Sequence, residues 1–553
     1  MARALPSRPV ALALSDGVIG PGTTVFDYGC GRGADIRHLR LQGINVEGWD
    51  PVFAPEHPRC PAEVVNLGYV VNVIEDPAER VAVLRAAWDL AQRALVVSAR
   101  LRWEEPGLTG RRLGDGIVTK AGTFQRFYDQ DELRDWVEAA LGTRSVAAAP
   151  GIFYVFRHRA DSERLLSERA RRGSRQGGGR IADILFEQHR EPLERLREFV
   201  VANGRIPSAL ELREYAALAD VFGSIRGAFL VMRRAIGPRA LEGVDIGVRT
   251  NTAERRFAHH YELLGPLLDF VEERGRLPHS GELANESELN TSFGSVRQAF
   301  SLVRRATGGQ RWHDVTARRR DDFLVYLALS AFGGRPKFSE LPEELRFDAR
   351  DFFGSYQAAS KRADALLFAA GDSRLRDEAC RDSPFGKLTP EALYLHQCEA
   401  GQLAPVLRVY EGCGRALSGS VDGANIIKLH RQKSQVSYLS YPSFDTDAHP
   451  RLTSVVISQL SRLDVTYRDF NGSENPPVLH RKETFVSKHY PGRQKFERLT
   501  QQEERHGLLA NPETIGTMQG WDERLRSANW ALRGHRLVRT STAPSAMRSC
   551  LDP

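Results

Sequence analysis

Short apolar runs alternate with amphipathic stretches over the first part of the chain. The apolar runs lie at 25–28, 44–49, 63–74 and 94–101. Each has the length of a buried strand, and the stretches between them repeat apolar residues at helical spacing. This alternation is typical of a parallel, doubly wound sheet, so we expect a Rossmann-like α/β domain at residues 1–158. Between Asp50 and Val64 there is room only for a loop, and one strand–helix unit of this sheet should be missing.

The middle of the chain contains an internal repeat. FVVANGRIPSALEL and FGSIRGAFLVMRRAIG recur as FVEERGRLPHSGEL and FGSVRQAFSLVRRATG, with Gly204 and Gly275 71 residues apart. A third, more divergent copy ends at 352–371. Each copy predicts a helix that stops at a glycine, a short helix, a Phe-Gly-Ser corner capped by a serine such as Ser224 or Ser295, and a longer helix. We therefore expect an all-α region of three helix-turn-helix-like repeats at 186–375.

Arginines recur at matching positions of the last helix of each copy. They are Arg226, Arg233 and Arg234 in the first copy and Arg297, Arg304 and Arg305 in the second. On a helix of 3.6 residues per turn they lie on a flank about 90° or more from the apolar stripe, where they can contact phosphates along a duplex. The net charge of +7 and the basic Gly/Arg-rich linker expected at 159–185 agree with a nucleic-acid partner, preferably duplex DNA. The alternative is a helical spacer whose arginines only keep it hydrated.

A glycine-rich turn follows the first predicted strand. Glycines at 29, 31 and 33 let the backbone turn sharply and approach a ligand that a Cβ would repel, and the next helix points its positive end at that ligand. The second strand ends at Asp50, whose carboxylate can accept hydrogen bonds from both hydroxyls of a ribose. Dinucleotides and S-adenosylmethionine both fit this pattern, and the acid just before the turn favours S-adenosylmethionine. The expected cofactor contacts are Asp27, Gly29, Gly31, Gly33, Asp50 and Leu67.

Several segments together resemble one family, the methyltransferases associated with DNA phosphorothioation. The resemblance is carried by FDYGCGRGADIRHL, GWDP, VVNLGYVVNVIEDP, VVSARL and GDGIVTKAGTFQRFY, and by VYEGC, GANIIKLHR and NPPVLHRKETFV in the last third. It covers most of the chain. It implies a class I S-adenosylmethionine-dependent methyltransferase domain, a role in DNA modification and restriction, and other proteins of a phosphorothioation system as partners.

The candidates for the methyl-acceptor side are Asn66 and Tyr69. Amino-methylating DNA enzymes hold the target amine with an Asn or Asp, two prolines and an aromatic residue, and Asn66-Leu67-Gly68-Tyr69 occupies that place. We expect Asn66 to accept a hydrogen bond from an exocyclic amine and Tyr69 to stack on a flipped base. The prolines are absent from this sequence. The alternative is that Asn66 lines the cofactor and Tyr69 lies in the core.

The last third, 376–553, predicts a mixed α/β domain with polar clusters. They are IIKLHRQKSQ at 426–435, SFDTDAHP at 443–450 and NPPVLHRKETFV at 475–486. Acids that alternate with histidine can bind a divalent metal, but they also occur in ordinary turns, so we expect no metal site and leave a nucleic-acid-binding surface open.

The composition bounds the cellular location. No apolar run reaches the roughly 18 residues of a membrane span, and the six cysteines form no CxxC pair, so we expect a cytoplasmic protein without membrane contact. Two functions stay open. The chain transfers methyl groups to nucleic acid, or it keeps the cofactor fold as a sensor or scaffold in a DNA-binding component of a defence system.

Overall fold

The computed structural model describes residues 5–105, 109–171, 189–222, 224–236, 259–488 and 490–540, with short pieces at 186 and 256–257. The chain forms two compact units. Unit 1 comprises residues 1–166, 328–341 and 363–553, and unit 2 comprises residues 167–327 and 342–362.

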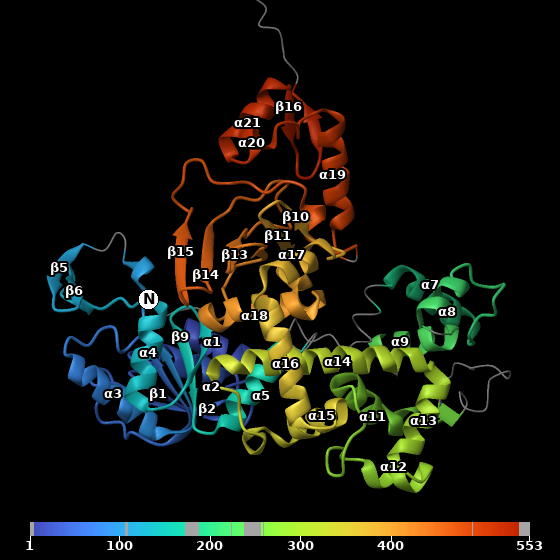
Figure 1. Cartoon of the computed structure of the whole chain (residues 1–553), viewed down its shortest axis with the longest axis horizontal. Helices are drawn as coiled ribbons and strands as arrows, with labels where there is room; N and C mark the ends of the chain where they lie inside the picture. The colour runs from blue at the N-terminus through green and yellow to red at the C-terminus, as the bar shows by residue number, and fades with distance from the viewer. Residues whose placement is uncertain are drawn as a thin grey trace, which may run out of the picture. The chain divides into compact units, whose positions relative to one another are not determined.

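Unit 1 begins with a six-stranded sheet in the order β2-β1-β3-β4-β9-β8 (Figure 1). Its strands are β1 (Thr24–Tyr28), β2 (Asn45–Trp49), β3 (Ala62–Gly68), β4 (Ala91–Ser98), β8 (Ser145–Ala149) and β9 (Ile152–Phe156). The first four are mutually parallel, as expected, and β2 leads to β3 without an intervening helix or strand. The prediction of a purely parallel sheet is wrong at one edge. There Gly151, with φ 76°, turns the chain back so that β9 runs antiparallel to both neighbours.

Helices cover both faces of this sheet. They are α1 (Arg8–Ser15), α2 (Ala34–Leu41), α3 (Pro77–Leu90), α4 (Gln130–Leu141) and α5 (Arg159–Ala170). Successive strand residues point to opposite faces, so Phe26 and Val65 join one core with Leu84 of α3, while Val25 and Val64 join the other with Leu39 of α2. Helix α5 occupies the start of the segment expected to be a linker, and residues 172–185 of that segment lie outside the described residues.

The middle of the chain is helical, and its helices fall in the three copies read from the sequence. The first copy contains α7 (Arg190–Asn203), α8 (Tyr215–Phe222) and α9 (Ile225–Ile236), the second α11 (Tyr261–Arg274), α12 (Glu286–Phe293) and α13 (Val296–Thr307), and the third α14 (Gly309–Leu329), α15 (Glu343–Phe353) and α16 (Tyr356–Gly371). Gly204 and Gly275 end their helices with φ 65° and 73°, as predicted. Ser224 and Ser295 accept backbone N–H groups at the starts of α9 and α13. The apolar stripe of α9 is buried in the core of its copy.

The rest of unit 1 is built on an antiparallel sheet in the order β10-β11-β12-β13-β14-β15. Its strands are β10 (Lys387–Leu388), β11 (Ala392–His396), β12 (Ile426–His430), β13 (Gln435–Ser440), β14 (Ser454–Gln459) and β15 (Asp464–Asp469). The surrounding elements are α17 (Ser373–Arg381), α18 (Pro405–Ser418), α19 (Arg493–Arg505), α20 (Pro512–Ile515), α21 (Met518–Ser527) and the hairpin β16 (Trp530–Leu532)–β17 (Leu537–Arg539).

Helix α18 links the two sheets of unit 1. It packs on β13 and β14, and its carboxyl end lies against β8. There Ser420 N–H donates to Ala148 O at 2.7 Å, and Arg134 of α4 donates to the carbonyls of Ala416 and Leu417. The C-terminal region therefore packs directly on the first sheet.

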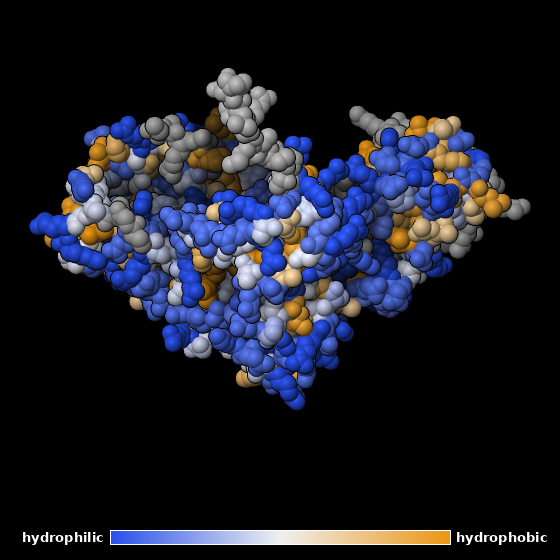
Figure 2. Space-filling model, turned by 90° about the horizontal axis from the view of Figure 1, so that it is seen from above, coloured by the Kyte–Doolittle hydropathy of each residue, from blue (hydrophilic) through white to orange (hydrophobic). Residues whose placement is uncertain are grey.

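Apolar surface is scattered rather than continuous on the face drawn in Figure 2, which is mostly hydrophilic with small separate hydrophobic patches. Within the described residues, no single helix has the length and hydrophobicity needed to cross a membrane. Only the bent pair α8–α9 meets that test, with its two helices taken together.

Candidate functional site

The predicted cofactor residues meet at one edge of the first sheet. Because β1, β2, β3 and β4 are parallel, their carboxyl ends lie side by side. Asp27 is opposite Gly48 on β2 and opposite Asn66 on β3, and the glycine turn, Asp50 and Tyr69 follow directly from these three strands. In open α/β sheets, ligands bind in the crevice at the carboxyl ends of the strands.

The glycine turn has the conformation that the sequence predicts. Gly29, Gly31 and Gly33 have φ of 81°, 52° and 69°, a region that favours glycine. A Cβ on Gly29 would lie 2.5 Å from Val70 Cγ2, whereas a Cβ on Gly31 would have no atom within 4 Å. Gly29 is thus required for packing, and Gly31 presents its backbone to open space. No side chain caps the first turn of α2, which leaves N–H groups at its positive end.

Asp50 holds the turn and the following loop together. Its Oδ2 accepts the N–H of Gly31 at 2.9 Å, and its Oδ1 accepts the N–H groups of Val52 and Phe53 at 2.9 and 3.0 Å. Val52 and Phe53 are 75% and 55% exposed, so apolar surface stands next to the carboxylate. This pairing of an acid with exposed apolar groups suits a nucleoside, which presents hydroxyls on one side and a flat base on the other.

Asn66 is paired with Asp27. Its amide Nδ2 donates to Asp27 Oδ1 at 2.8 Å, and both side chains are buried. Its Oδ1 is buried and has no hydrogen-bond partner within the described part of the chain. A buried amide oxygen without a partner is costly, so this atom is available to a bound group. Because Asn66 is only 2% exposed, no base amine reaches it in this conformation.

Tyr69 lies at the surface of the site and not in either core of the first sheet. It is half-buried and has φ 60°, an unusual value for a bulky residue, and its N–H donates to the carbonyl oxygen of Ser98 at 3.0 Å. Burial raises the pKa of Tyr69, while the positive charge of Arg8 opposes that shift. Arg8 also donates to Pro150 O and pairs with Asp422. Nothing in the sequence pattern singled out Arg8.

Two further predictions concern side chains at this edge. Leu67 was expected to contact the cofactor, but it is 0% exposed and belongs to the core beneath α3 and α4, because it alternates with Asn66 along β3. Only its backbone can face the site. Cys30 was expected to be a turn residue and not a nucleophile. Burial, with Asp27 and Asp50 nearby, raises the pKa of its thiol to about 11, so the thiolate is scarce at neutral pH.

The repeat arginines do not form one uniform row. Arg297, Arg304 and Arg305 are exposed on α13 and Arg233 is half-exposed on α9, as a phosphate-contacting flank requires. Arg226 is buried, at 9% exposure, so its expected place on that flank is wrong. The side chain of Arg234 lies outside the described residues.

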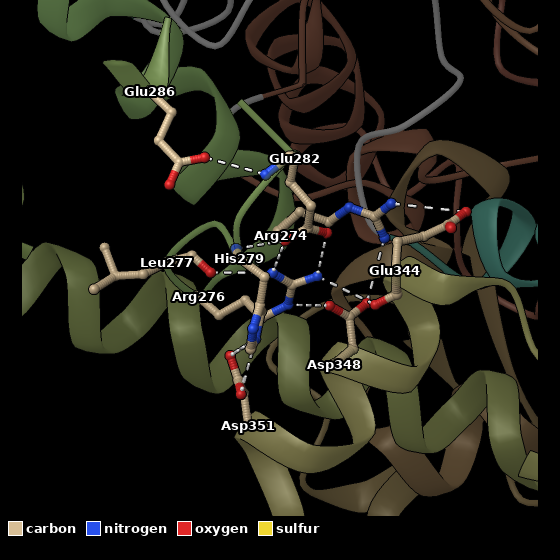
Figure 3. Close-up of polar contacts among 10 residues, drawn as sticks. Arg274, Arg276, Leu277, His279, Glu282, Glu286, Glu344, Asp348 and Asp351 are labelled. Carbon is tan, nitrogen blue, oxygen red and sulfur yellow. Dashed lines mark hydrogen bonds and ion pairs between the residues drawn. The ribbon is translucent and has the colours of Figure 1, made fainter. Parts of the chain in front are cut away.

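The arginine of each Gly-Arg-x-Pro turn closes the turn itself. The guanidinium of Arg205 donates to both carboxylate oxygens of Glu211. The guanidinium of Arg276 donates in the same way to both carboxylate oxygens of Glu282, at 2.6 and 2.8 Å. In the second copy the pair is buried, and Arg276 Nε also donates to Asp348 of α15 at 2.6 Å (Figure 3). The spacing of six residues between Arg and Glu recurs in both copies, and this signal in the sequence could have revealed the pairs.

The polar clusters of the last third are only partly exposed, and several of their charged side chains are buried. His430, Arg431 and Lys482 are buried, and Arg431 is paired with Asp377. Lys482 Nζ donates to the carbonyls of Phe444 and Asp447 and lies 3.0 Å from His535 Nε2. These residues therefore hold loops together. The sequence left open whether the clusters form a nucleic-acid-binding surface, and these three side chains do not form one because they are buried.

A buried hydrogen bond joins His449, which precedes β14, to Glu503 of α19. His449 Nδ1 lies 3.2 Å from Leu479 O and its Nε2 lies 2.7 Å from Glu503 Oε1. Burial lowers the pKa of His449 to about 4 and raises the pKa of Glu503 to about 7. Because burial lifts the pKa of Glu503 above that of His449, a neutral O–H···N hydrogen bond is favoured over an ion pair. Across the described residues, no three His, Cys, Asp or Glu side chains are grouped to hold a metal.

Part of the chain aligns with the solved structure of a known protein. CalS10, an amino pentose methyltransferase from Micromonospora echinaspora with S-adenosylmethionine bound, aligns with 27% of this chain and 88% of its own length, at 17% identity and a TM-score of 0.19. No protein-family model matches the chain. No curated protein matches it either.

Proposed function

We propose that this protein is an S-adenosylmethionine-dependent methyltransferase that acts on nucleic acid, preferably duplex DNA, in a DNA phosphorothioation or defence system. The observation that carries the proposal is the edge of the first sheet. Gly31 has open space at its Cα and donates its N–H to Asp50, and the buried Oδ1 of Asn66, whose amide is paired with Asp27, has no partner among the described residues. The family resemblance of the sequence supports the acceptor and the cellular context.

The residues at this edge fit the parts of S-adenosylmethionine. Asp50 can accept a ribose hydroxyl, and Val52 and Phe53 offer apolar surface to a flat base. The N-terminal turn of α2 and Asp27 would hold the charged amino-acid end, with Asn66 keeping Asp27 oriented. When bound, the cofactor supplies an electrophilic methyl group on a sulfonium. We reassign Asn66 to this cofactor side because of its burial.

Tyr69 is the acceptor-side residue in the proposal. It is half-buried at the carboxyl end of β3, where a base can pack against an exposed ring face. Exposed Arg297, Arg304 and Arg305 would supply phosphate contacts.

A two-part experiment tests the proposal. Calorimetric titration of the full chain with S-adenosylmethionine should show binding, and incubation with the tritiated cofactor should label duplex DNA. Tyr69→Ala should lower transfer with little change in cofactor affinity, whereas Tyr69→Phe should retain part of it. Binding without transfer to DNA or RNA would instead favour a sensor or scaffold, and no binding would overturn both.

A further inference from the structure

A small antiparallel sheet is inserted between β4 and α4. It consists of β5 (Gly110–Leu113), β6 (Gly116–Thr119) and β7 (Phe124–Gln125), and we call residues 110–125 the arm. Figure 1 shows β5 and β6 outside the six-stranded sheet. Because β4 is parallel to β1, β2 and β3, the chain leaves β4 toward the arm from the same edge that carries the glycine turn and Tyr69.

The arm is attached to the loop that follows Tyr69. Where β7 ends, Arg126 N–H donates to Asn72 O at 2.7 Å, and Asn72 Nδ2 donates to Gln125 Oε1 at 3.0 Å. Asn72 is only 1% exposed. The arm is therefore held directly beside the acceptor-side loop, three residues beyond Tyr69.

An ion pair between a buried arginine and an exposed aspartate fixes the turn of the arm. Arg80 of α3 is 0% exposed and donates two hydrogen bonds to Asp115, at 2.7 and 2.8 Å. Arg126 pairs with the same carboxylate at 3.1 Å. Asp115 is the only acidic residue of the arm, and these two arginines outside the arm already balance its charge.

The cations of the arm point outward. All four residues of the edge strand β5 are exposed, including Arg111 and Arg112, and Lys120 is exposed just after β6. Arg112 pairs with Glu105 at 3.0 Å but keeps 75% of its side chain exposed. Within the described ranges, neither Arg111 nor Lys120 forms an ion pair with an acidic side chain. Two outward arginines on the edge strand and an outward lysine in the turn after β6 give the arm a positive surface that is complementary to a polyanion.

We propose that the arm binds the sugar–phosphate backbone of the nucleic acid that carries the methyl acceptor, through Arg111, Arg112 and Lys120. The inference rests on the proposed function and adds a second phosphate-binding surface to it, beside the cofactor edge. A guanidinium group matches a phosphate with two parallel hydrogen bonds. The repeats would then supply affinity, while the arm would orient the strand at the site.

The test is the triple variant Arg111→Gln, Arg112→Gln and Lys120→Gln in the full chain. The matched control is Arg40→Gln, Arg85→Gln and Arg144→Gln, which removes the same three charges from exposed positions on α2, on α3 and before β8. Fluorescence anisotropy would measure the affinity for duplex DNA, duplex RNA and single-stranded DNA over a range of KCl concentrations. Calorimetry would measure binding of S-adenosylmethionine to each protein.

The arm variant should flatten the slope of log affinity against log salt on duplex DNA, by up to about 2.7 for three phosphate contacts at about 0.9 each. Its cofactor affinity should equal that of the wild type, and the control should keep the wild-type slope. A wild-type slope in the arm variant, an equal change in the control, or no nucleic-acid binding by the wild type would overturn the proposal. Binding that depends on the arm without any methyl transfer would uphold the arm while the proposed function fails. The three nucleic acids decide whether the backbone belongs to DNA or RNA.

Discussion

Replacement of Asp50 gives the sharpest test of the cofactor site. A carboxylate has two oxygens and about four acceptor positions. Three are already used, one on Oδ2 by Gly31 and two on Oδ1 by Val52 and Phe53. One position is left on Oδ2. Asp50 therefore cannot accept hydrogen bonds from both ribose hydroxyls, as the sequence suggested. We predict that it accepts one, from a single ribose hydroxyl.

The variant Asp50→Asn removes that bond, together with the hydrogen bond that Gly31 N–H donates to Oδ2. Its amide oxygen can replace Oδ1 and keep the N–H groups of Val52 and Phe53, while its NH₂ group cannot accept at the Oδ2 position. A hydrogen bond to a charged group contributes about 1.5–3 kcal/mol. At 1.4 kcal/mol for each factor of ten, the dissociation constant for S-adenosylmethionine should rise roughly 10- to 150-fold.

Calorimetric titration of wild type and variant measures this change, and thermal unfolding checks that the turn is intact. Glu47→Gln is the control, since Glu47 is an exposed carboxylate on the same strand. It should bind like the wild type. Unchanged affinity in Asp50→Asn would refute the site, and a loss well above 1,000-fold with a normal melting temperature would refute the single-bond reasoning.

Four further outcomes are expected. Gly31→Ala should weaken cofactor binding and lower stability by about 1–2 kcal/mol, the cost of a Cβ at positive φ, whereas Gly48→Ala should lower the melting temperature by steric overlap, because its Cβ would lie 2.7 Å from Ile36 Cδ1 and 2.9 Å from Asp27 O. Replacement of Arg297, Arg304 and Arg305 by Gln should weaken binding to unrelated duplexes alike and lower the salt slope, and sequence-selective loss would contradict this. Asp348→Ala should destabilise unit 2 by about 3–5 kcal/mol in denaturant unfolding, because it leaves the buried Arg276 without its Nε partner. Burial lowers the pKa of Lys482 to about 7, below its unfolded value of 10.5. The unfolded state therefore binds more protons between these values, and stability should rise with pH from 7 to 10 in the wild type by at most about 1.4 kcal/mol per unit. Lys482→Met should lack that rise, and parallel melting profiles of the two proteins would disprove it.

In the repeats, local sequence patterns predict where helices begin and end but not which side chains are exposed. Gly204 and Gly275 end their helices and Ser295 caps the next because these are properties of a few consecutive residues. The same pattern could not place Arg226, whose exposure depends on which helices pack over α9. Helical spacing puts a residue on a flank, but only packing decides whether that flank faces solvent.

The sequence by itself determined the glycine turn, the acid at the end of β2, the missing strand–helix unit and the three helical repeats. These follow from backbone sterics and from hydrophobic periodicity, both of which act over short stretches of chain. Only the tertiary structure decided that Leu67 faces the core, that Asn66 pairs with Asp27, that Arg8 reaches Tyr69 and that Asn72 holds the arm. Those contacts join residues distant in sequence, so they depend on which faces of the strands are covered and on the hydrogen-bond partners left after burial.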